Sequence, residues 1–298
     1  MFWISKRIVF PVALCLLLGC NRSPEVIPET PDGTVQAVID GLGDNQPQVV
    51  WDALPAGYQA DVRELISTFS THMDASLYDR VFRIFGKAVK ILEVKEDYIF
   101  NSPMALNTPL IESGMGNNWK EIVRILNTLV KSDLSTLQSL SQMDPGEFFA
   151  STGHKVMEDL ENLMQRSQRS SSNNPWKMLE QAQIEFVKAT DDQASLKFVI
   201  STNSVQEIDM ARVEGRWVPA DMAATWNEGV AKAKQGMENL NSPEFKKAIP
   251  MVSMILASAE GIVESLLKSG SQKEFDELLK SLSTVGAMFQ SFQSQGEK

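Results

Sequence analysis

Cysteine is nearly missing from this chain of 298 residues, which has only Cys15 and Cys20. Both lie near the N-terminus, so the rest of the chain has no thiol that could form a disulfide, ligate zinc or act as a nucleophile. Stability must therefore come from an ordinary hydrophobic core. With 43% hydrophobic residues, the chain is long enough for one large core or two modest ones.

Histidine is equally scarce, with His72 and His154 far apart in the sequence. His72 precedes Asp74 by two positions and His154 precedes Glu158 by four, so each pair could supply two metal ligands. No third ligand is marked for either pair, and a solvated helix face or a local salt bridge explains both. The His-Glu-x-x-His, Gly-x-Ser-x-Gly and phosphate-binding glycine motifs are missing as well. The sequence thus predicts no catalytic residue, no metal and no cofactor.

Basic residues are outnumbered, with 28 Lys and Arg against 38 Asp and Glu and a net charge of −10. Nucleic-acid binding draws on clustered Lys and Arg, so this balance argues against a nucleic-acid partner. The same charge opposes flat adsorption on anionic lipid headgroups.

The N-terminal segment carries the most specific pattern. A basic pair, Lys6-Arg7, precedes an apolar run over residues 8–18, which is too short for a span because crossing a bilayer takes about 20 apolar residues. The run leads into Leu17-Leu18-Gly19-Cys20, which resembles the lipobox of bacterial lipoproteins. The resemblance implies that residues 1–19 are a signal peptide whose Leu17, Leu18 and Gly19 are recognised by the type II signal peptidase. It also implies that Cys20 carries a diacylglycerol and is then acylated at its new amino group, for example with palmitate.

The lipobox predicts attachment to a lipid bilayer through N-terminal acyl chains. Two or more chains anchor a protein stably, whereas one is marginal. Loss of residues 1–19 would leave a net charge of −12. Residues 20–33 are polar and proline-bearing and predict the lipidated cysteine followed by a flexible tether. Asn21 replaces the Asp that retains enterobacterial lipoproteins in the inner membrane, so we expect the periplasmic face of the outer membrane of a bacterial cell envelope.

The remaining chain predicts an α+β fold that is mainly helical. An α+β domain is expected over residues 34–222, with a helical insertion at about 59–174 and a β-meander of three to four strands at about 183–219. A helical region follows over residues 223–294, with a break at Asn241-Ser242-Pro243. Its apolar stretch 249–267 is interrupted by Pro250, Glu260, Gly261 and Glu264. The polar stretch 167–175 predicts a surface loop.

The end of the meander, Val213-Glu214-Gly215-Arg216-Trp217-Val218-Pro219, suggests a second family. Together with the two short helices of residues 34–55, it resembles the nuclear transport factor 2-like fold of bacterial lipoproteins of unknown function. The resemblance implies helices packed across a curved antiparallel sheet that leaves a pocket. The helical insertion and the C-terminal helices depart from that family and could fill the pocket.

Two functions remain open at this stage. The first is a non-enzymatic binding or scaffolding module that faces the periplasm and contacts another envelope protein. The second is a periplasmic enzyme or small-ligand-binding protein that uses a pocket in the sheet, lined by Trp217. A strand tryptophan is more often part of the core. Met251, Met254 and Met288 could likewise form a groove for a partner, but their helical spacing favours core packing.

The lipobox generates the first testable prediction. Radiolabelled palmitate should enter the wild-type protein in its bacterial host and should not enter Cys20→Ala, because only the Cys20 thiol and its amino group accept the acyl chains. Labelling of the variant, together with its continued fractionation with membranes, would show that Cys20 is not the anchor.

Overall fold

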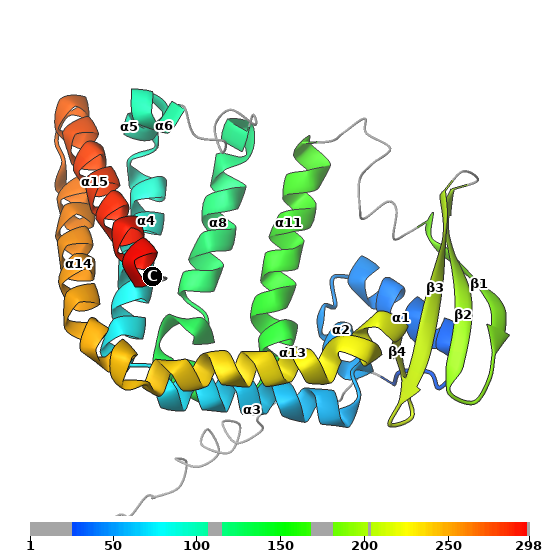
Figure 1. The fold of residues 1–298 in the computed structure, drawn as a ribbon. Helices are drawn as coiled ribbons and strands as arrows, with labels where there is room; N and C mark the ends of the chain where they lie inside the picture. The colour runs from blue at the N-terminus through cyan, green and yellow to red at the C-terminus, as the bar shows by residue number, and fades with distance from the viewer. Residues whose placement is uncertain (1–25, 107–114, 168–180, 202–203, 297–298) are drawn as a thin grey trace, which may run out of the picture.

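A four-stranded antiparallel sheet closes one end of the molecule, and helices make up the rest (Figure 1). The computed structural model describes residues 26–106, 115–167, 181–201 and 204–296. The predicted class, α+β and mainly helical with one antiparallel meander, is confirmed. The predicted signal peptide and Cys20 lie outside the described residues, as does the loop of residues 167–175 from residue 168 on.

The sheet is a simple meander in the order β1-β2-β3-β4, with every neighbouring pair antiparallel. It fills the range predicted from the period-two pattern, since its strands are β1 (Gln183–Ala189), β2 (Gln193–Ser201), β3 (Ser204–Val213) and β4 (Arg216–Pro219).

The hairpin between β3 and β4 turns at Glu214 and Gly215, which have φ values of 49° and 81°. Positive φ at both central positions is the geometry of the primed turns that match the twist of paired strands. Gly215 adopts it without steric cost, whereas Glu214 does not. The Glu214 carboxylate is fixed in place because the Gly57 backbone N–H donates to its Oε2 at 2.7 Å. The turn therefore also joins the sheet to the start of the helical part.

One face of the sheet packs on α1 (Pro31–Gly43) through a small apolar cluster of Ala194, Leu196, Met210 and Trp217, against which Val35 of α1 lies. Trp217 is only 5% exposed. Its indole N–H donates to the backbone oxygen of Glu29 at 2.8 Å, so the polar atom of this core residue is satisfied.

The predicted tether is wrong from Ile27 onward. Ile27 is buried against Val49 and Ala53, and Arg216 donates to its backbone oxygen at 3.3 Å. The first helix begins at Pro31, not at residue 34, because Thr30 is the N-cap and Pro31 occupies the first turn, where its missing N–H has no cost. The prolines of this segment thus predicted a tether, although Ile27 within it is buried.

The helices form two layers, and the helix axes of one layer run across those of the other (Figure 1). Helices α3 (Ala56–His72) and α13 (Ala220–Glu238) run side by side away from the sheet end, joined by Tyr58 stacked on Trp226 with ring centroids 4.0 Å apart. Four further helices stand side by side across this pair, in the order α11 (His154–Ser167), α8 (Trp119–Val130), α4 (Ala75–Val94) and α14 (Pro243–Lys268). Helix α14 of the C-terminal region thus completes a row whose other helices lie within residues 75–167.

Shorter elements connect these helices. They are α2 (Gln48–Ala53), α5 (Glu96–Phe100), α6 (Pro103–Leu106), α9 (Leu137–Gln142), α10 (Pro145–Phe148) and the single turns η1 (Met115–Asn118), η2 (Asp133–Ser135), η3 (Phe149–Gly153) and η4 (Asn239–Asn241). The last helix, α15 (Gln272–Gly296), folds back against α14. Two aspartates cap helix starts: at α4, Asp74 accepts a hydrogen bond from the Leu77 N–H, and at α10, Asp144 accepts one from the Glu147 N–H.

Helix α14 begins at Pro243, at the predicted break, and is continuous to Lys268 through Pro250 and Gly261. Pro250 removes one backbone N–H and so frees the carbonyl of Lys246. Both residues are exposed, so water can hydrate that carbonyl. Gly261 is also on the exposed side of the helix.

Removing Trp217 should destabilise the protein, because the side chain is buried between the sheet and α1. We expect Trp217→Ala to lower the free energy of unfolding by about 3–5 kcal/mol, measured by urea denaturation. Phe186→Ala on β1 is the matched control, since Phe186 is 55% exposed and its loss should cost little. Equal effects of the two substitutions would mean that the sheet is not docked on α1 through Trp217.

Candidate functional site

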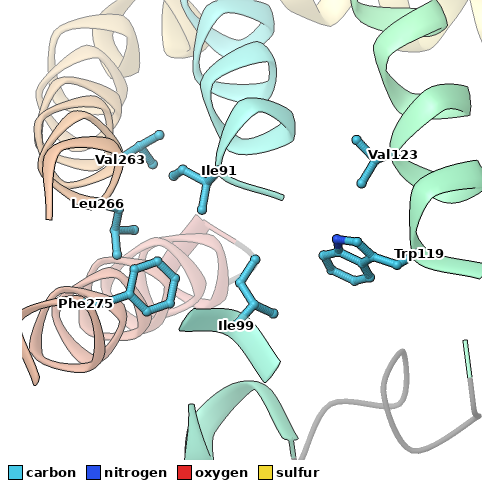
Figure 2. Packing of buried hydrophobic residues seen from close by; sticks show 7 residues of the cluster. All are labelled: Ile91, Ile99, Trp119, Val123, Val263, Leu266 and Phe275. Carbon is cyan, nitrogen blue, oxygen red and sulfur yellow. The ribbon is translucent and has the colours of Figure 1, made fainter. Parts of the chain in front are cut away.

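The largest buried apolar cluster lies at the end of the molecule away from the sheet. It joins α4, α5 and α8 with the C-terminal helices α14 and α15, and its members are Ile91, Ile99, Trp119, Val123, Val263, Leu266 and Phe275. Figure 2 shows the Trp119 ring extending from α8 toward Ile99, which lies between this ring and that of Phe275.

A pocket of about 390 Å³ opens beside this cluster. Its lining is apolar throughout the residues that the structure describes, and comes from α4, α5, α6, α8, α14 and α15: Ala88, Ile91, Leu92, Ile99, Met104, Trp119, Ile122, Leu126, Val263, Leu266, Phe275, Leu279 and Leu282. Such a lining offers dispersion contacts and exclusion of water, and it offers a charged group nothing to bind.

Helical spacing places these side chains in the pocket. On α8, Trp119, Ile122 and Leu126 follow at intervals of three and four, which puts them on one face of the helix. On α15, Leu279 and Leu282 follow Phe275 in the same way. The pocket is the space between these two apolar faces, with α4 behind it.

Aromatic contacts hold the walls. The ring of Phe100 meets Trp119 edge to face with centroids 5.1 Å apart, and Tyr98 meets Phe275 with centroids 5.6 Å apart. The indole N–H of Trp119 donates to the backbone oxygen of Leu92 at 2.9 Å. This hydrogen bond satisfies the polar atom of Trp119 and fixes its ring against α4.

An ion network joins α4 and α14, two of the helices that line the pocket. Glu260 of α14 accepts hydrogen bonds from Arg83 Nε at 2.7 Å and from Lys87 Nζ at 2.8 Å, both on α4. Lys87 also pairs with Glu264. These hydrogen bonds from Arg83 and Lys87 lower the pKa of Glu260 from 4.5 to about 2. The contact between α4 and α14 is thus charged along the side that carries this network and apolar on the side that faces the pocket.

Two polar contacts fix the turn between α14 and α15. Lys95 Nζ donates to the backbone oxygen of Ser269 at 2.6 Å, and the Gln272 side chain donates to that of Tyr98 at 2.9 Å. The start of α15, which carries Phe275, is thereby held over α5.

Trp217, named from the sequence as lining a pocket in the sheet, lies in the core at the opposite end of the molecule. A hollow of about 480 Å³ does lie along the sheet, lined by both polar residues such as Thr190 and apolar ones such as Met210. In it Ser195 donates to Asp209 at 2.8 Å. The lining of this hollow does not include Trp217. A ligand site at Trp217 stays a prediction.

The two histidines are not brought together. His72 Nδ1 is buried without a hydrogen-bond partner among the described residues, and His154 Nδ1 lies 2.5 Å from the backbone oxygen of Asn45. Within the described ranges, no group of three or more His, Cys, Asp or Glu could hold a metal ion.

Comparison with known proteins gives no relative: no family model, no curated protein and no solved structure matches the chain. The resemblances to lipoproteins and to the nuclear transport factor 2-like fold stay predictions.

Sequence reasoning did not find the pocket. The helical spacing of Ile122 and Leu126, and that of Leu279 and Leu282, gives each of two separate helices an apolar stripe. These stripes are the only hint that the sequence gives of this site. No local pattern in the sequence shows that the two apolar helix faces are separated by a space beside α4.

Acid should weaken the attachment of α14 to α4. Because the pKa of Glu260 is lowered in the folded protein, its ionised form stabilises the fold above about pH 4.5, and this contribution is lost as the pH falls toward 2. In urea denaturation we expect Glu260→Gln to be less stable than wild type at neutral pH, and the difference to shrink between about pH 4.5 and 2.

Glu93→Gln is the control for this experiment, since Glu93 pairs with Lys90 on the surface and such pairs contribute little. A constant difference between wild type and Glu260→Gln across this pH range would contradict the assignment.

Proposed function

We propose that the protein is a lipid-anchored binding module of the bacterial envelope that holds an aliphatic chain in the pocket between α4, α8 and α15. The observation that carries the proposal is the continuous apolar lining of a pocket of about 390 Å³. This volume lies within the range of about 300–1,000 Å³ that is usual for sites of small molecules.

The apolar lining determines which chemical class of ligand can bind in the pocket. A charged or strongly polar group would lose its hydration in the pocket without gaining a hydrogen bond, which costs several kcal/mol. An aliphatic chain gains about 0.8 kcal/mol for each methylene removed from water. The buried part of the ligand is therefore an acyl or alkyl chain, with any polar head left outside.

The expected lipid anchor at Cys20 fits this proposal. Acyl chains on Cys20 would keep the pocket beside a bilayer, where aliphatic ligands are abundant. The charge of the chain, −10 overall, opposes adsorption of the whole surface on anionic lipids. The protein would then exchange single ligand molecules with the membrane, and its surface would not lie flat on the membrane.

The alternative from the sequence, an enzyme or small-ligand-binding protein with its site at the sheet, is the weaker proposal. The burial of Trp217 in the sheet core removes the side chain that was expected to line that site.

Quenching by a brominated fatty acid tests the proposal directly. In the mature chain with Cys20→Ala, which has no acyl chains of its own, dibromostearic acid should quench tryptophan fluorescence saturably, because Trp119 lines the pocket. Trp119→Phe should remove most of this quenching, and Trp217→Phe, at the sheet, should retain it. If Trp217→Phe removed the quenching and Trp119→Phe retained it, the ligand would bind at the sheet.

A second substitution fills the pocket. Ala88→Phe adds a ring inside the lining and should raise the dissociation constant for oleic acid about tenfold or more. Ala231→Phe, on the exposed face of α13, is the control and should leave binding unchanged. Unchanged affinity in a folded Ala88→Phe protein would rule out this pocket.

A further inference from the structure

The outer face of α14 is apolar and uncovered. Met251 is 44% exposed and Met254 is 66% exposed, so the expected core packing of these methionines is wrong; Met288 lies outside the residues whose side chains are described. Among the described residues, α14 is the one helix long and apolar enough to cross a membrane, yet only 11% of its most apolar stretch is buried. An apolar face of this kind marks an interaction surface.

The face is divided into a protruding half and a hollow half. Met251 and Met254 extend from its first half, whereas its second half presents the small residues Ala257, Ser258 and Gly261, all exposed. A side chain at Gly261 would meet no atom within 4 Å, so the space above this half is open.

These halves fit each other when two copies of the helix pair in opposite directions. A two-fold axis at the level of Ile255 and Leu256 places Met254 of each copy over Ala257 and Ser258 of the other, and Met251 over Gly261. Large side chains then fill the space above small ones, as in closely packed helix pairs. A surface that is complementary to itself is what a two-fold dimer requires.

The charges at the ends of the face obey the same symmetry. Lys246 and Lys247 lie exposed at its beginning, and Glu264, which also pairs with Lys87 of α4, lies exposed near its end. The axis that aligns the methionines also brings Lys246 and Lys247 of one copy to the level of Glu264 of the other. Antiparallel helix dipoles add to this attraction. A parallel arrangement would instead place like charges together.

We infer that α14 is a self-association surface, through which two copies of this chain form an antiparallel dimer. Because α14 is the outermost helix of the row α11-α8-α4-α14, the dimer extends that row across both molecules (Figure 1). The pocket lies on the opposite side of α14 from this surface, so association does not depend on the proposed ligand.

Sedimentation equilibrium of the mature chain with Cys20→Ala tests the inference. The protein should form a dimer, and Met254→Lys should raise the dimer dissociation constant at least about tenfold. Val205→Lys is the control, since Val205 is 50% exposed but lies on the sheet at the other end of the molecule. Monomers at all concentrations, or equal weakening by both substitutions, would overturn the inference.

Disulfide trapping tests the antiparallel direction, since the mature chain with Cys20→Ala has no other cysteine. In the proposed pair the two copies of residue 254 are offset by about 4.5 Å along the helix, and those of residue 247 by about 26 Å. A disulfide joins Cα atoms no more than about 7 Å apart. Met254→Cys should therefore cross-link between copies and Lys247→Cys should not. Cross-linking at both positions would overturn the antiparallel arrangement.

Insertion of α14 into a bilayer is the rival explanation of its exposed face. If a monomer binds phosphatidylcholine vesicles, loses this binding on Met254→Lys and gives no cross-link at Met254→Cys, the surface contacts lipid and the inference is wrong. Quenching by dibromostearic acid in the Met254→Lys variant measures ligand binding in the pocket independently of self-association.

Discussion

The packing of α14 on α4, with α15 folded back against α14, is the interaction on which the rest of the structure depends. The contact joins segments about 170 residues apart, for Lys87 and Glu260 differ by 173 positions. The ion network around Glu260 fixes one side of the contact, and Leu266 and Phe275, both fully buried, fix the other. Without this contact the pocket would lose Phe275, Leu279 and Leu282. The α4 face that bears Ile91 would then stand open to water.

The pocket is an interruption in a close-packed interior, and such interruptions cost stability. Apolar space left unfilled removes dispersion contacts from the side chains around it. Here the space persists because α8 and α15 are each fixed by other contacts, α8 through the Trp119 hydrogen bond to Leu92 and α15 through the Gln272 hydrogen bond to Tyr98. Walls held in this way do not collapse, which leaves an apolar ligand to supply the missing contacts.

Local patterns in the sequence predicted the local structure well. The alternation of residues 183–219 predicted the meander, because a strand period depends on a few neighbouring residues. The errors arose where distant contacts override composition. Ile27 is buried by contact with Val49 and Ala53, in a segment whose prolines predicted a tether.

The candidate site was beyond prediction for the same reason. The apolar stripes of α8 and α15 were evident, but a stripe does not say whether it meets another stripe or leaves a space. Nor does it say whether a helix face is covered, since Met251 and Met254 have core-like spacing and yet lie exposed. The prediction at Cys20 is different in kind, because a processing enzyme would read a linear motif and would need no fold.

The central claim is that an aliphatic chain occupies the pocket between α4, α8 and α15. Its most direct test is a nuclear Overhauser measurement on the mature protein with uniformly ¹³C-labelled palmitate. The account predicts cross-peaks from the palmitate methylenes to the indole protons of Trp119 and the ring protons of Phe275. Cross-peaks to Trp217 alone, or none at a saturating concentration of palmitate, would contradict it.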